Sequence, residues 1–132
     1  MGCIFETEVM PAAAQVVVVA EGSVDLPQWA TGEEAAVANE SGVLVATRDD
    51  LSGDVTMRVF PSDAHASLSE KVHEGRLHLP TGSVEIGSML SGQLSLVKVG
   101  EPGNYRVSVF ASPTEAVSLV ELVLAPEPRI RR

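Results

Sequence analysis

The residue types that most often carry catalysis or bind metals do not form a working pattern in this chain. The three histidines are His65, His73 and His78, and the odd spacing of the last two would place them on opposite faces of one strand. The sequence lacks the paired ligand motifs of a zinc site, such as CxxC or HExxH. We therefore predict no metal site and no cofactor, although a pocket that joined His73, His78 and Asp63 would indicate an enzyme.

Serine and aspartate side chains also lack the context that their chemistry requires. No serine lies in a G-x-S-x-G elbow, and no glycine-rich phosphate-binding motif is present. Asp49, Asp50 and Asp54 surround a glycine turn, but their order differs from that of an EF-hand loop and suits a hairpin turn. The sequence therefore predicts a protein without enzymatic activity.

Acidic side chains are the charged groups that this chain has in excess. Its 132 residues include 18 Asp and Glu but only 9 Lys and Arg, which gives a net charge of −9. The first 47 residues have no lysine or arginine and contain the acids Glu6, Glu8, Glu21, Asp25, Glu33, Glu34 and Glu40. Such a field repels nucleic acids, whose binding depends on cationic contacts, and attracts a basic protein partner.

The cysteine content and the N-terminal sequence predict the compartment. Cys3 is the single cysteine, so no disulfide can form within the chain. No basic region precedes the apolar run 16–20, which is too short to cross a bilayer. We therefore expect a cytoplasmic protein that makes no contact with a membrane.

Apolar runs predict a domain made mostly of strands. The segment 54–60 (DVTMRVF) alternates between apolar and polar residues, whereas the continuous run 14–21 indicates burial on both faces. The eight predicted strands are 14–21, 42–48, 54–60, 76–79, 83–86, 93–99, 105–111 and 117–124. Short strands with turns at close spacing are typical of an antiparallel β-sandwich. We expect one such domain over residues 1–125, followed by a tail at 126–132 that contains two prolines.

Two local signals refine this β-sandwich. Thr31 and Glu34 have the spacing of a capping box, and an alanine-rich stretch follows them, which predicts one short α-helix near residues 32–39. The turn of Asp and Gly residues between 42–48 and 54–60 predicts that these two strands form a hairpin.

Several segments, taken in order, resemble the competence protein J family. The segments are Trp29 with the stretch 33–39, then 42–48 (GVLVATR), 71–72 (KV), 79–82 (LPTG), 84–86 (VEI), 87–91 (GSMLS), 94–96 (LSL), 103–105 (GNY) and 110–113 (FASP). The resemblance covers the chain from about Val16 to Leu124. The members of the competence protein J family are small bacterial proteins, and the best-known type inhibits a DNA-entry nuclease. The resemblance therefore implies a non-enzymatic domain similar to a nuclease inhibitor.

Charge and resemblance together predict a binding protein that occludes a basic partner such as a nuclease. The acid-rich first third of the chain would cover the cationic site, and the single tryptophan would serve as an anchor if it is exposed. The predicted contact residues are Asp25, Trp29, Glu33, Glu34 and Glu40.

Two other functions and the oligomeric state stay open at this point. A small-ligand or carbohydrate-binding sandwich would show Trp29 beside Tyr105 in one open cleft. An uncharacterised structural domain is the other alternative, and the sequence does not decide whether the protein forms a homo-oligomer.

Overall fold

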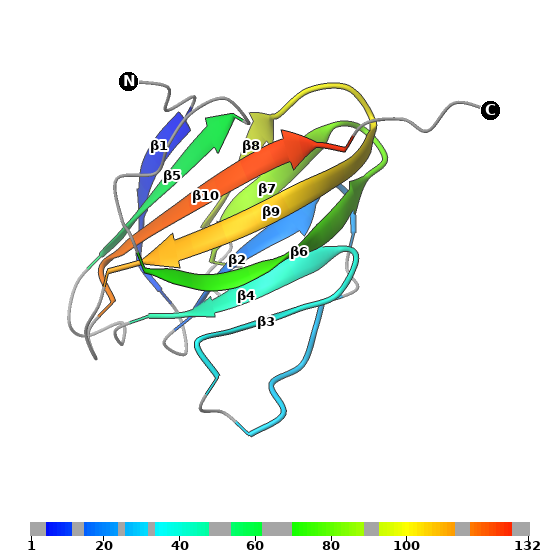
Figure 1. Cartoon of the computed structure of the whole chain (residues 1–132). Coiled ribbons are helices and arrows are strands. Elements are labelled where there is room, and N and C mark those ends of the chain that lie inside the picture. The colour runs from blue at the N-terminus through cyan, green and yellow to red at the C-terminus, as the bar shows by residue number, and fades with distance from the viewer. Residues whose placement is uncertain are drawn as a thin grey trace.

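The computed structural model describes residues 5–11, 15–23, 26–31, 34–47, 54–61, 70–88, 93–112 and 117–127. Within these ranges the chain forms ten strands in two five-stranded sheets that pack against each other (Figure 1). Sheet A has the order β1 (Phe5–Val9), β5 (Val55–Pro61), β10 (Leu119–Pro126), β9 (Gly103–Ala111) and β6 (Lys71–Leu79). Sheet B has the order β3 (Ala36–Ala38), β4 (Gly42–Ala46), β2 (Gln15–Ala20), β7 (Ser83–Ser88) and β8 (Gln93–Lys98). The predicted two-layer β fold is therefore confirmed.

The main core lies between the two sheets and is almost entirely aliphatic. On β5, Val55, Met57 and Val59 are fully buried, as their alternation predicts. Sheet B contributes Val16 and Val18 of β2 from the other side, along with residues of its neighbouring strands. Close packing of these side chains between the layers holds the fold together.

Strand β2 is buried on both faces, which its continuous apolar run predicts. While Val16 and Val18 face the main core, Val17 and Val19 face outward into a second, smaller cluster together with Leu44 of β4. Four partly buried side chains pack against this outer cluster: Leu26, Trp29, Val37 and Leu94. The outer cluster therefore fixes the segment between β2 and β3 to the outer face of sheet B.

The predicted helix near residues 32–39 is wrong, because residues 36–38 form strand β3. Val37 lies opposite Leu44 in an antiparallel pair with β4, and it packs on the outer cluster. A run of seven or eight residues is too short to hold a helix through alanine propensity alone, so sheet pairing prevails.

The predicted hairpin between 42–48 and 54–60 is also wrong. Strand β4 pairs with β2 and β3 in sheet B, whereas β5 pairs with β1 and β10 in sheet A. The sandwich is not purely antiparallel either, because β5 and β10 run parallel. The prediction of about eight strands missed β1 as well as β3.

Strand β10 continues to Pro126, which lies opposite Tyr105, and the backbone N–H of Glu127 donates to the Asn104 carbonyl at 3.0 Å. The boundary between domain and tail at residue 125 stays a prediction, because residues 128–132 lie outside the described ranges. In the described part of the chain, no helix has the length and apolarity needed to cross a membrane.

Candidate interaction surface

The outward face of sheet A contains cations that acids of the same molecule neutralise. Lys71 Nζ lies 3.0 Å from Glu74, and Arg106 lies 3.5 Å from the same carboxylate. Arg76 pairs with Glu127 at 2.8 Å. This face therefore offers a partner little uncompensated charge.

Arg58 is held between two carboxylates on this face. It lies 2.9 Å from Glu6 and 3.1 Å from Glu121, whose side chain has 0% exposure. Hydrogen bonds to Glu121 and to Glu6 raise the pKa of Arg58, so the guanidinium stays charged. The sequence contained no signal for this buried carboxylate, which lies on an outward position of the central strand β10.

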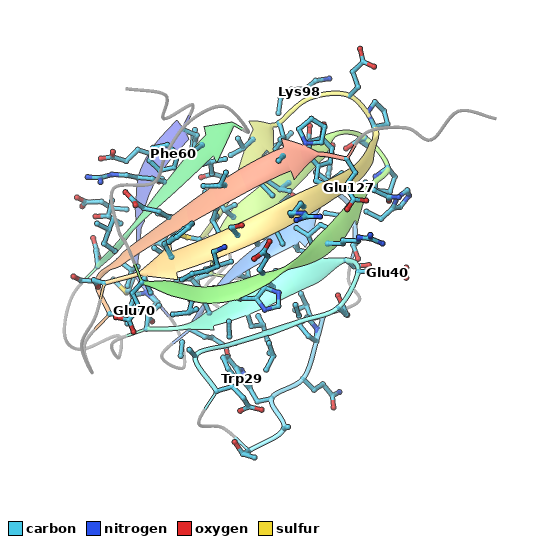
Figure 2. All side chains as sticks on the ribbon, viewed as in Figure 1. Trp29, Glu40, Phe60, Glu70, Lys98 and Glu127 are labelled. Carbon is cyan, nitrogen blue, oxygen red and sulfur yellow. The ribbon has the colours of Figure 1, made fainter. Side chains whose placement is uncertain are left out.

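A hollow of about 220 Å³ lies where the ends of β2 and β6 meet the turn between β3 and β4. Its charged and polar lining residues are Glu21, Ser23, Glu40, Ser41 and His78, and Ala20, Gly22 and Pro80 complete the lining. Figure 2 shows Glu40 at this end of the molecule, where β6 approaches sheet B.

Backbone hydrogen bonds fix the walls of the hollow. Ala20 N–H donates to the Ser41 carbonyl at 2.8 Å, and His78 N–H donates to the Glu40 carbonyl at 2.8 Å. The second of these bonds joins sheet A to the β3–β4 turn. The Asn39 side-chain oxygen accepts from the N–H of Ser41 at 2.8 Å and so shapes that turn. The backbone segments that carry Glu21 and Glu40 are therefore held in place by hydrogen bonds.

The side chains of the hollow are oriented by their neighbours. Glu21 Oε1 accepts from the Thr81 hydroxyl at 2.7 Å, and His78 Nδ1 lies 2.8 Å from the Asn104 side-chain oxygen. Among the described residues, neither Glu21 nor Glu40 has a lysine or arginine partner. This end of the molecule therefore carries negative charge that the described cations leave uncompensated.

Trp29 lies on the segment that extends below β3 in Figure 1 and is labelled there in Figure 2. Its ring packs on the outer cluster, and its Nε1–H donates to Gln15 Oε1 at 2.7 Å. The side chain is half-buried, so part of its surface is already used to hold this segment on sheet B.

Glu34 closes a turn next to Trp29. Its carboxylate accepts from the N–H of Ala30 at 2.8 Å, from the N–H of Thr31 at 3.2 Å and from the Thr31 hydroxyl at 3.1 Å. Its own backbone N–H, followed by those of Ala30 and Thr31, lowers the pKa of Glu34 to about 2. The capping-box contact between residues 31 and 34 thus exists, but it closes a turn before a strand.

The described acids of the first third do not form one patch. Glu6 and Glu8 lie on β1, Glu34 closes the turn before β3, and Glu21 and Glu40 line the hollow. Of the predicted contact residues, Asp25 and Glu33 lie outside the described residues.

Sequence reasoning selected Glu40 but missed Glu21, its neighbour in the hollow. The available signal was position, because each acid lies just beyond the end of a strand, Glu21 after β2 and Glu40 after β3. Both strands belong to sheet B, and strand ends within one sheet can share an edge of the molecule.

The histidines do not assemble a catalytic or metal site in the described part. His73 and His78 lie on opposite faces of β6, and Asp63 lies outside the described residues. Burial lowers the pKa of His73, whose Nε2 has no hydrogen-bond partner. No group of three His, Cys, Asp or Glu side chains in the described ranges could hold a metal ion.

The aromatic cleft expected of a sugar-binding sandwich is not formed. Tyr105 is buried in the main core between the sheets, while Trp29 packs on the opposite side of sheet B. The two rings therefore do not lie side by side.

Comparison with known proteins identifies the fold. No family model matches the chain, and no curated protein matches it. The crystal structure of ComJ from Bacillus subtilis, an inhibitor of the DNA-degrading activity of NucA, matches with a TM-score of 0.72 and 15% identity, over 95% of this chain and 97% of that one. Crocagin biosynthetic gene J matches with a TM-score of 0.61 and 14% identity, over 95% of this chain and 100% of that one. The resemblance to the competence protein J family is thus confirmed at the level of the fold.

Proposed function

We propose that this protein is a non-enzymatic binding protein that inhibits or modulates a basic protein partner, such as a nuclease, by covering its cationic surface. The observation that carries the proposal is the fold shared with ComJ, a nuclease inhibitor, along 95% of the chain. Because fold alone does not define function, the proposal also draws on the charge distribution.

The charge distribution supports occlusion of a cationic site. A nuclease must hold a polyanion, so its cleft requires cationic side chains. The net charge of −9 would steer the inhibitor toward such a cleft, and steered association is fast at low salt. On the outward face of sheet A, Glu74 and Glu127 are already paired with Lys71 and Arg76. The uncompensated carboxylates of the hollow are therefore the part of the described surface best suited to bind a cationic partner.

The hollow would receive a lysine or arginine side chain of the partner. Glu21 and Glu40 supply carboxylate oxygens, and the hydroxyls of Ser23 and Ser41 supply further acceptors. The hydrogen bonds that fix its walls reduce the entropy lost on binding, because little has to be ordered. Glu34 adds a negative charge, and Trp29 holds the segment that bears it.

The binding of small ligands is the less favoured alternative. The hollow is smaller than the roughly 300–1,000 Å³ usual for drug-sized ligand sites. The separation of Trp29 from Tyr105 also removes the stacking surface that a sugar would use. A hollow of this size with two carboxylates in its lining fits one basic side chain of a protein better than a free metabolite.

The experiment measures DNA degradation by a NucA-type nuclease, with the protein added at increasing concentration. We expect inhibition that saturates at a fixed ratio of the two proteins, without cleavage or chemical change of either. The dissociation constant should rise steeply with salt, because the contacts are ionic. Inhibition that is equally strong at low and high salt would contradict the electrostatic mechanism, and no inhibition of any basic nuclease would contradict the function itself.

A further inference from the structure

Strand β8 forms an open edge of sheet B. Among the described strands, only β7 pairs with it. Its Leu96 is 57% exposed, and Met10 is the other large apolar side chain exposed in the described ranges. An open edge with an exposed apolar side chain is a ready template for pairing with another strand.

The pairing pattern shows which backbone groups of β8 face outward. Val99 N–H donates to the Gly82 carbonyl at 2.9 Å, toward β7, and the direction alternates along an antiparallel strand. On the other side of β7, Glu21 N–H donates to the Ser83 carbonyl, so Ser83 directs its backbone groups away from its opposite residue on β8, Lys98. Both observations place the N–H and C=O groups of Leu94, Leu96 and Lys98 on the open edge.

We propose that β8 pairs antiparallel with β8 of a second copy of this chain, about a two-fold axis at Leu96. In this register Leu96 faces Leu96 of the second copy, and Leu94 faces Lys98 on either side of the axis. Each facing pair exchanges two backbone hydrogen bonds, so all three outward residues find partners. Sheet B of one copy then continues into sheet B of the other, through an isologous interface.

The side chains suit this register. The two Leu96 side chains cover each other on the outer face, next to the half-buried Leu94. The two copies of Lys98 lie about 14 Å apart, four residues along the strands, so they do not repel at short range. Glu85 of β7 lies opposite Leu96, at the level of the two-fold axis, so its negative charge lies between the levels of the two copies of Lys98.

The β1 edge of sheet A does not offer the same complementarity. Strand β1 presents Glu6 and Glu8 as its exposed side chains, so pairing with its own copy would bring like charges together. Figure 2 shows Lys98 far from Glu40, one of the two carboxylates of the hollow.

The mass in solution tests the dimer, and cysteine cross-linking tests its register. Light scattering coupled to size exclusion should give twice the 13.9 kDa of one chain for the wild type. In a Cys3→Ser background, Leu96→Cys should form a disulfide-linked dimer, because facing Cα atoms of such a pair lie about 5.5 Å apart, within disulfide range. The matched control Lys98→Cys should stay unlinked.

Two substitutions separate the dimer from the fold of the monomer. Leu96→Pro removes an N–H that bonds no other described strand, so the monomer should keep its circular dichroism while the dimer is lost. If that variant does not fold, Leu96→Glu, which places two like charges opposite each other at the two-fold axis, should lose the dimer instead. A wild type that is monomeric at every concentration, a dimer that persists in these folded variants, or equal cross-linking through Lys98→Cys would overturn the proposal.

Discussion

Removal of Arg58 should destabilise the protein far more than its partial exposure suggests. The Glu121 carboxylate is fully buried and lies 3.1 Å from this guanidinium, so Arg58→Met leaves a buried negative charge without its cation. Breaking a buried pair by removing one partner typically costs about 3–5 kcal/mol. Because the Arg58 side chain is 32% exposed and water can reach it, we expect about 3 kcal/mol of lost unfolding free energy.

The matched control is Arg76→Met on the same sheet. Arg76 forms an even shorter ion pair, at 2.8 Å from Glu127, but the Arg76 side chain is 75% exposed and Glu127 keeps 19% exposure, so water reaches both charges. Exposed pairs contribute about 0–1 kcal/mol, so this variant should stay close to the wild type. The double variant Arg58→Met/Glu121→Gln should regain part of the stability lost in Arg58→Met, because it also removes the buried negative charge.

Urea unfolding, monitored through the fluorescence of Trp29, measures the unfolding free energies of the three variants and the wild type. In thermal unfolding, the midpoint of Arg58→Met should lie about 10 °C below that of the wild type. If the unfolding free energies of Arg58→Met and Arg76→Met differ by less than about 1 kcal/mol, then the buried Glu121 carboxylate is not stabilised mainly by Arg58. The ion pair between Arg58 and Glu121 would then contribute little to the stability of sheet A.

Three further predictions concern pH and the turns. Burial lowers the pKa of His73 below the ordinary histidine value of 6.5, so the stability that depends on neutral His73 should be complete above pH 6.5 and decrease at lower pH. In urea unfolding at several pH values, His73→Asn should show a smaller loss of unfolding free energy below pH 6.5 than the wild type. The pKa of Glu34 is lowered from 4.5 to about 2, so the stability that ionised Glu34 gives to its turn should be complete above pH 4.5 and disappear toward pH 2. Trp29 emission should change with pH over this range in the wild type, and Glu34→Gln should remove that change. Gly82 has a φ of +78°, and a Cβ there would overlap the Gly100 carbonyl oxygen, so Gly82→Ala should lower the thermal midpoint more than Gly22→Ala, which shares the positive φ (+83°) but has open space around it.

The strands that depend on local pattern could be predicted from the sequence. The alternation of Val55, Met57 and Val59 predicted the buried face of β5, and the continuous run of β2 predicted burial on both faces. The two missed strands carry weak local signals: β1 is rich in acids and β3 is rich in alanine. Their pairing with β5 and β4 defines them as strands, and such pairing depends on the whole sheet rather than on local sequence.

The arrangement of the sheets and the hollow could not be derived from local sequence. The parallel pairing of β5 with β10 joins segments about sixty residues apart, and no turn signal between them specifies it. The hollow likewise requires His78 of sheet A to bond the backbone of Glu40 next to sheet B. Acid content indicated the sign of the charge, but only the folded chain brings Glu21 next to Glu40.

The most direct test compares two charge reversals that change the net charge by the same amount. Glu40→Lys alters the hollow, whereas Glu8→Lys alters an exposed acid on β1, away from it. With a NucA-type nuclease at low salt, we expect Glu40→Lys to raise the dissociation constant by at least about tenfold and Glu8→Lys to change it only slightly. Equal effects of the two reversals, or no effect of either, would contradict the claim that the carboxylates of the hollow bind the basic partner.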